Sequence, residues 1–185
     1  MWTLPNLLTI ARVIAAPLVA VIFLILPRPG ADLIAFVLFA LAAVTDYLDG
    51  WLARKWGQVS SFGRMLDPIA DKAMVVIAGG VLMMLHPFDW RVIIPLAAIL
   101  LREVLVSGLR EYLKGAEVLS VTTLAKWKTT AQLFAIGLIL FSGAYEWALW
   151  PGFALLWVAA AMTVVTGWDY FAKGIAYIRA EEDAR

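Results

Sequence analysis

Residues 46–71 read DYLDGWLARKWGQVSSFGRMLDPIAD, and this stretch decides the fold. It joins the end of one apolar segment to the start of the next. Four aspartates lie on it at helical spacing: Asp46, Asp49, Asp67 and Asp71. Residues three or four positions apart share one face of a helix, so each aspartate pair lines one side of its segment. The short turn between the segments predicts two antiparallel helices that hold all four carboxylates at a similar depth.

The composition of the chain places these helices in a lipid bilayer. Of the 185 residues, 63% are hydrophobic and 16% are charged, whereas soluble domains have about 45–50% apolar and about 25% charged residues. A formal net charge of +1 argues against nucleic acid as a partner. The absence of cysteine excludes disulfides and thiolate metal sites. We expect a single domain over residues 1–185, because no linker, low-complexity run or repeat divides the chain.

Six segments are long and apolar enough to cross a membrane as helices, which takes about 20 residues each. Proline or glycine separates most of them, and tryptophans lie at several of their ends, as in an aromatic belt. The segments cover residues 7–26, 31–56, 64–85, 90–114, 126–145 and 150–178. The sequence therefore predicts an all-α, polytopic membrane protein of six transmembrane helices. The first segment lacks a basic leader and a small-residue cleavage site, so we expect it to be retained.

The basic residues predict the orientation of these helices. Lysine and arginine are frequent in the loops after the second and fourth segments and in the C-terminal tail, and rare in the other connections. Basic loops stay on the cytoplasmic side of a membrane. Both termini and the four aspartates are therefore expected on the cytoplasmic face.

Four carboxylates in a partly dehydrated place repel one another unless cations neutralise them. Hard divalent cations prefer oxygen ligands, so the aspartates favour Mg²⁺ or Mn²⁺ over zinc or copper. Gly50 and Ala53 continue the acidic face by one turn and let a ligand approach the helix backbone. Arg54 follows one turn after Gly50, where a guanidinium can hold a phosphate by two hydrogen bonds. This pattern indicates a pyrophosphate site. A lone acid in a membrane helix is often a packing or salt-bridge residue, but four on adjacent segments favour a functional site.

The full spacing is Asp46-x2-Asp49-Gly50-x2-Ala53-Arg54-x8-Gly63-x3-Asp67-x3-Asp71, and it resembles the defining motif of the CDP-alcohol phosphotransferases at all eight positions. The resemblance implies that family's six-helix fold, usually as a homodimer, and transfer of a phosphatidyl group from a CDP-activated lipid to an alcohol. It implies two divalent metal ions, one bound by Asp46, Asp49 and Asp67 and the other by Asp46, Asp67 and Asp71. Asp71 would also be the general base.

The same resemblance implies a set of residues that bind the CDP-lipid. Ser60 stands where relatives have a threonine, a change that keeps the hydroxyl. The set consists of Asn6, Arg12, Gly50, Ala53, Arg54, Ser60 and Gly63.

Three further stretches, residues 5–12, 102–111 and 126–132, resemble the phosphatidylglycerophosphate synthases within that family. This resemblance implies CDP-diacylglycerol and glycerol 3-phosphate as substrates and the bacterial inner membrane as the location. An acceptor phosphate needs cations, and the stretches supply them at Arg102, Arg110, Lys126 and Lys128. The alternative is that some of these cations only set the orientation.

Other functions stay open at the level of sequence. The acceptor of a related enzyme could be inositol phosphate, serine or phosphatidylglycerol. A membrane prenyltransferase also pairs aspartate motifs with a lipid pyrophosphate, but it usually repeats the motif in each half. An ion channel or transporter would place its acids near the membrane midplane rather than at one end of two neighbouring helices.

Overall fold

The computed structural model describes residues 3–58, 60–113 and 123–183, and within them it leaves out the side chains of Thr123, Ala125, Lys126 and Glu181. The described residues form helices and no strand. The helices are α1 (Leu4–Ile25), α2 (Gly30–Lys55), α3 (Ser61–Leu85), α4 (Trp90–Tyr112), α5 (Thr123–Ser142), the short 3-10 helix η1 (Glu146–Ala148) and α6 (Leu149–Asp183). The prediction of an all-α chain is confirmed, and each predicted segment coincides with one long helix.

Within the part of the chain that the structure describes, five stretches are long and apolar enough to cross a membrane: α1, α2, α3, α4 and the run Glu146–Ala180. Helix α5 lies at the fifth predicted segment and is not among these five. Large apolar side chains such as Leu24, Val104 and Val165 lie exposed on the outside of the bundle. An outer surface of this kind suits contact with lipid rather than water.

The turn between α2 and α3 is built by local backbone chemistry. Gly57 has a φ of +63°, and the Gln58 N–H donates to the Ala53 carbonyl at 2.9 Å. This is the usual way in which a glycine ends a helix. Ser60 then caps α3, since its hydroxyl accepts a hydrogen bond from the Gly63 N–H at 2.9 Å. The chain therefore reverses within a few residues, as predicted.

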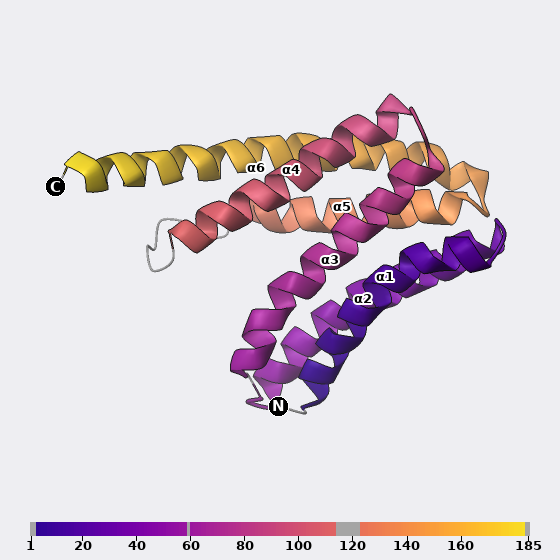
Figure 1. Ribbon diagram of the computed structural model, residues 1–185, viewed down its shortest axis with the longest axis horizontal. Coiled ribbons are helices and arrows are strands. Elements are labelled where there is room, and N and C mark those ends of the chain that lie inside the picture. The colour runs from indigo at the N-terminus through magenta and orange to yellow at the C-terminus, as the bar shows by residue number, and fades with distance from the viewer. Residues whose placement is uncertain (1–2, 59, 114–122, 184–185) are drawn as a thin grey trace.

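Two groups of helices make up the molecule (Figure 1). Helix α1 packs along both α2 and α3, while α6 packs along both α4 and α5. Contacts of α2 with α5 and of α3 with α4 and α5 join the groups. One core runs through all six long helices, with Val19, Phe39, Leu82, Leu96, Ile136 and Leu156 buried in it. The start of α1, the end of α2 and the start of α3 lie together at one end of the bundle.

Candidate functional site

Three of the four predicted aspartates gather around one side chain of α1. The Arg12 guanidinium donates through Nη1 to Asp46 and through Nη2 to Asp49, and Nη2 lies 4.0 Å from Asp67 Oδ1. Arg12 is 3% exposed and Asp49 5%, whereas Asp46 and Asp67 are 45% and 48% exposed. The carboxylates thus surround a buried positive charge, and two of them keep an open side.

A second polar side chain of α1, Thr9, joins the two aspartate-bearing helices. Its hydroxyl oxygen lies 3.1 Å from Asp49 Oδ2 and 3.0 Å from Asp67 Oδ1. Asn6, Thr9 and Arg12 are all buried, and their spacing of three residues places them on one face of α1. Sequence reasoning gave Thr9 no role. The signal was present, because polar residues at this spacing in an apolar segment mark a face turned toward protein rather than lipid.

The donor set of this acidic cluster suits a cation, and its three carboxylates already contact the cation of Arg12. As the side chains stand, no group of three or more acidic, histidine or cysteine side chains among the described residues is arranged to hold a metal ion. The Arg12 guanidinium lies between Asp46 and Asp49 and donates to both. The carboxylate oxygens suit a divalent ion as ligands. The Arg12 guanidinium would have to move out from between Asp46 and Asp49 for the ion to bind both.

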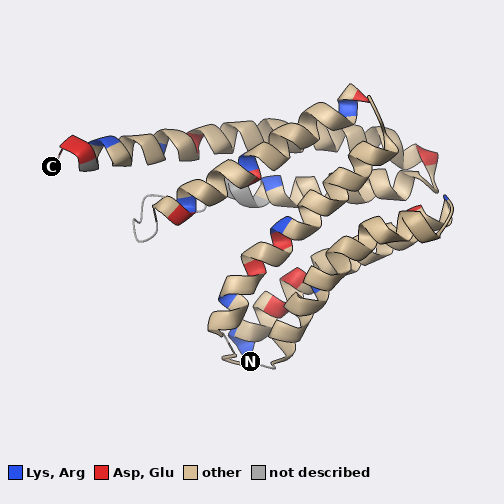
Figure 2. Cartoon of the chain, in the orientation of Figure 1, with Lys and Arg blue, Asp and Glu red and all other residues tan. Residues whose placement is uncertain are grey.

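The fourth aspartate, Asp71, lines a cavity of about 210 Å³ between α3, α4 and α5. The predicted acceptor residues Arg102, Arg110 and Lys128 line the same cavity, so the structure brings residues of three helices together. Figure 2 shows charged residues on these helices as well as on the ends of α2 and α3 near the start of α1. The lining consists of Pro68, Asp71, Lys72, Val75, Arg102, Glu103, Arg110, Lys128, Thr129 and Gln132.

Glu103 holds two of the cavity's cations in place. The buried Lys128 ammonium donates to Glu103 Oε1, and Arg102 Nη1 lies 3.3 Å from the same oxygen. The Arg102 Nε–H is buried and has no acceptor among the described residues. A buried N–H without a partner is uncommon, and each one needs a physical explanation.

Helix α6 contributes Tyr170, a residue that the sequence analysis did not single out. Its ring is buried, and the guanidinium carbons of Arg102 and Arg110 lie 5.5 and 5.3 Å from the ring centre. Arg110 Nη2 also lies 3.4 Å from the Tyr170 hydroxyl. Tyr170 therefore fixes the position of both arginines. Lys126 belongs to α5, but its side chain lies outside the described part of the chain.

The predicted CDP-lipid residues fall into three places. Gly50 and Arg54 lie on an open face of α2, where a Cβ added to Gly50 would meet only the Arg54 side chain, at 3.5 Å from Nη1. Ala53 is half-buried one turn after Gly50. Asn6, Ser60 and Gly63 instead lie where the start of α1 packs against the start of α3. The Ser60 hydroxyl donates to Asn6 Oδ1 there at 3.0 Å. Arg12 lies on the acidic cluster, as described above.

The close approach of Gly63 to Asn6 gives a first testable prediction. A Cβ on Gly63 would lie 2.8 Å from Asn6 Oδ1, so Gly63→Ala must displace the Asn6 amide from Ser60. We expect a loss of stability of about 1–3 kcal/mol, typical of overpacking, measured as a lower midpoint of thermal unfolding in detergent. Gly80→Ala is the matched control in α3, since nothing lies within 4 Å of its added Cβ. Equal midpoints for the two variants would contradict the prediction.

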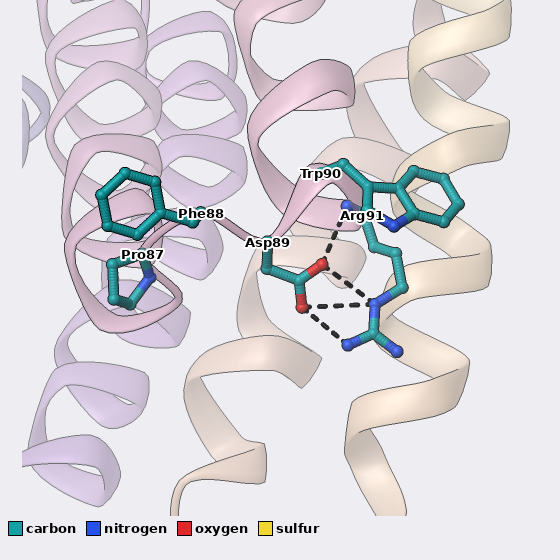
Figure 3. A pocket seen from close by; sticks show the side chains of 5 residues that line it. All are labelled: Pro87, Phe88, Asp89, Trp90 and Arg91. Atoms are coloured by element: carbon teal, nitrogen blue, oxygen red, sulfur yellow. Dashed lines mark hydrogen bonds and ion pairs between the residues drawn. The ribbon is translucent and has the colours of Figure 1, made fainter.

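The hollow at the opposite end of the molecule is larger, about 420 Å³, but its polar groups are already paired. Figure 3 shows the Arg91 side chain against the Asp89 carboxylate, with Phe88 and Pro87 turned away from them. Arg91 Nε lies 2.9 Å from Asp89 Oδ1, and Nη2 lies 2.8 Å from Oδ2. These hydrogen bonds hold the pKa of the Asp89 carboxyl below its usual range. No unsatisfied polar side chain is found on this lining in the described chain.

A comparison with protein families agrees with the geometry at the acidic end. The model of the CDP-alcohol phosphatidyltransferase family matches residues 2–165. The chain belongs to this family. Membership leaves the prenyltransferase and transporter interpretations without support. The matched residues include all five helices, α1 to α5, that carry the acidic cluster and the cavity lining.

Relatives within the CDP-alcohol phosphatidyltransferase family are similar over most of their length. The CDP-diacylglycerol–glycerol-3-phosphate 3-phosphatidyltransferase of Cereibacter sphaeroides is 46% identical over 219 aligned positions, covering 98% of this chain and 99% of the relative. Proteins with the same name from Rickettsia bellii and Salmonella choleraesuis are 45% and 41% identical. They cover 91% and 88% of this chain, and 93% and 90% of their own length.

Proposed function

We propose that this chain transfers the phosphatidyl group of CDP-diacylglycerol to glycerol 3-phosphate, giving phosphatidylglycerophosphate and CMP. The observation that carries the proposal is the cavity in which Arg102, Arg110 and Lys128 lie with Asp71. Its volume of about 210 Å³ is below the roughly 300–1,000 Å³ of pockets for drug-sized ligands. A small phosphorylated alcohol fits such a space. The names of the relatives support the same donor and acceptor.

Asp46, Asp49, Asp67 and Asp71 are the proposed ligands of two divalent ions, Mg²⁺ or Mn²⁺. Three of these carboxylates already contact or approach one cation, the guanidinium of Arg12. When bound, the ions would neutralise charge on the pyrophosphate of the donor. The open face at Gly50 and Arg54 is the proposed binding site of that pyrophosphate, since the Arg54 guanidinium can hold a phosphate by two hydrogen bonds.

The proposed reaction is an attack by the primary hydroxyl of glycerol 3-phosphate on the lipid-side phosphorus. Asp71 accepts the hydroxyl proton as general base, since its carboxylate lines the acceptor cavity. The new bond joins the acceptor oxygen to that phosphorus. The bond to the CMP oxygen breaks, and CMP leaves with the electron pair.

The membrane arrangement is part of the proposal. We infer that α5 is the sixth span, because it is a 20-residue helix with Phe134 exposed on its outer side. Basic loops flank the acidic end, so both termini and the site are proposed to face the cytoplasm. The relatives come from bacteria, which supports the bacterial inner membrane as the location. A homodimer is proposed from the family resemblance.

An acceptor panel tests the proposed reaction. Purified full-length protein with CDP-diacylglycerol and Mg²⁺ is expected to release CMP with glycerol 3-phosphate, and much less with inositol phosphate, serine or phosphatidylglycerol. Faster CMP release with one of the other acceptors would overturn the choice of glycerol 3-phosphate.

Removal of one cation from the cavity should affect the acceptor alone. Losing a hydrogen bond to a charged group costs about 1.5–3 kcal/mol, so Arg110→Ala should raise the KM for glycerol 3-phosphate about ten- to hundredfold. The KM for CDP-diacylglycerol should stay unchanged. The control is Arg179→Ala, which removes an exposed arginine of α6 outside the cavity. A rise in both KM values would indicate general damage, and no rise in either would leave Arg110 only a topological role.

A further inference from the structure

Gln132 of α5 is a buried polar side chain that the mechanism above does not use. The residue is 2% exposed and lines the cavity. Its carbonyl oxygen, Oε1, accepts no hydrogen bond from any described residue. Arg102 lines the same cavity, and its buried Nε–H has no acceptor in the described chain. Two residues of one cavity lining therefore carry an unpaired acceptor and an unpaired donor.

These two groups define the ligand that would satisfy them. Burying a polar group without a partner is unfavourable, so a ligand that pairs with both gains free energy on binding. Arg102 Nε–H needs an acceptor, and a phosphate oxygen is one. Gln132 Oε1 needs a donor, which a phosphate dianion lacks and an alcohol hydroxyl supplies. The cavity thus suits a molecule that carries both a phosphate and a hydroxyl.

The position of Gln132 along α5 indicates which hydroxyl it meets. Gln132 follows Lys128 by four residues, so the two side chains share one face of α5. Lys128 is one of the proposed phosphate-binding cations, and Asp71 on α3 is the proposed partner of the reacting hydroxyl. Gln132 consequently belongs to the phosphate side of the cavity, one helical turn from the ammonium.

We propose that Gln132 determines acceptor specificity by accepting a hydrogen bond from the secondary hydroxyl of glycerol 3-phosphate, the hydroxyl next to the phosphate-bearing carbon. This inference rests on the proposed function. A site built to pair with a hydroxyl rejects an analogue that lacks it, because the buried carbonyl is then left without a partner. Gln132 would therefore distinguish a phosphorylated triol from a phosphorylated diol of the same length.

The test compares two acceptors that differ only in that hydroxyl, glycerol 3-phosphate and 3-hydroxypropyl phosphate. With full-length wild-type protein and CDP-diacylglycerol, kcat/KM from CMP release should be about ten- to hundredfold higher for glycerol 3-phosphate, the usual cost of leaving a buried polar group unpaired. Gln132→Met keeps the shape of the side chain and removes the carbonyl. It should bring the ratio close to one by lowering the glycerol 3-phosphate value alone. Gln58→Met, an exposed residue in the turn after α2, is the control and should leave the ratio as in wild type.

A second variant gives a signature that a purely structural role would not produce. Gln132→Glu keeps an acceptor oxygen and adds a charge that repels the phosphate, so kcat/KM should fall for both acceptors while the ratio persists. A ratio near one in this variant, or a wild-type ratio in Gln132→Met, would overturn the assignment of Gln132. An equal loss on both acceptors in Gln132→Met would overturn it too. If wild-type protein releases CMP with another acceptor and not with glycerol 3-phosphate, the proposed function itself fails.

Discussion

Asp67→Asn is expected to leave the fold intact and to lower turnover by about a thousandfold. Asp67 is proposed to contact both metal ions, and metal ions stabilise charge in such transition states by several kcal/mol, which corresponds to about a thousandfold in rate. The structural cost should be small. Asp67 is 48% exposed, lies 4.0 Å from Arg12, and keeps its contact with the Thr9 hydroxyl as an amide. CMP release and the thermal midpoint, measured on the same preparation, separate the two effects.

Two aspartates serve as controls for this experiment. Asp49→Asn should lower both turnover and stability, because Asp49 is buried and paired with Arg12 and Thr9. Asp169→Asn should change neither, since Asp169 forms a half-exposed pair with Lys173 on α6. Wild-type turnover by Asp67→Asn at low Mg²⁺ concentration would rule out the proposed two-metal arrangement.

Arg12→Met is expected to destabilise the metal-free protein by about 3 kcal/mol. Removing one partner of a buried ion pair leaves an uncompensated charge and costs about 3–5 kcal/mol. The lower value applies because Asp46 is half-exposed and water can reach it. Divalent ions should restore more stability to this variant than they add to wild type, because the metal no longer has to replace the guanidinium. The measurement is the thermal midpoint in EDTA and during titration with Mg²⁺ or Mn²⁺.

The matched control for this charge removal lies at the other end of the molecule. Arg28 pairs with the fully buried Asp32 at 2.9 Å, so Arg28→Met also leaves a buried carboxylate without its cation. It should lower the midpoint but leave the response to metal ions unchanged. Equal midpoints of Arg12→Met and wild type in EDTA, or equal gains on metal addition, would contradict the role given to Arg12.

The sequence predicted the helices well because residues close to each helix end determine where the helix begins or stops. Gly57 and Ser60 end α2 and start α3 by hydrogen bonds to residues a few positions away, and such signals can be found without knowledge of the fold. The exception is α6, which continues to Asp183, past the predicted end at residue 178. The last turns of α6 are polar, so the sequence there lacks the apolar pattern by which a longer membrane helix would be predicted.

The candidate site was predictable only in part. Asp46 and Asp49 can be recognised as candidate site residues because charged side chains are rare in apolar membrane segments. Their pairing with Arg12 depends on how α1 packs against α2, which the spacing does not show. The role of Arg12 in CDP-lipid binding stays a prediction. Tyr170 lies 60 residues from Arg110 in the chain, in a region without a motif. Contacts over such separations are products of tertiary packing, which periodicity and spacing do not encode.

The position of Arg12 has a consequence for how the chain enters the membrane during synthesis. Its partners Asp46 and Asp49 follow 34 and 37 residues later, so Arg12 leaves the ribosome before its counter-charges do. A lone arginine near the centre of a membrane helix costs about 2.5–3.5 kcal/mol on insertion. Helix α1 therefore gains a partner that neutralises its charge only once α2 has emerged. We expect the two helices to enter the bilayer together, so that the residues that later face the substrate first serve to assemble the protein.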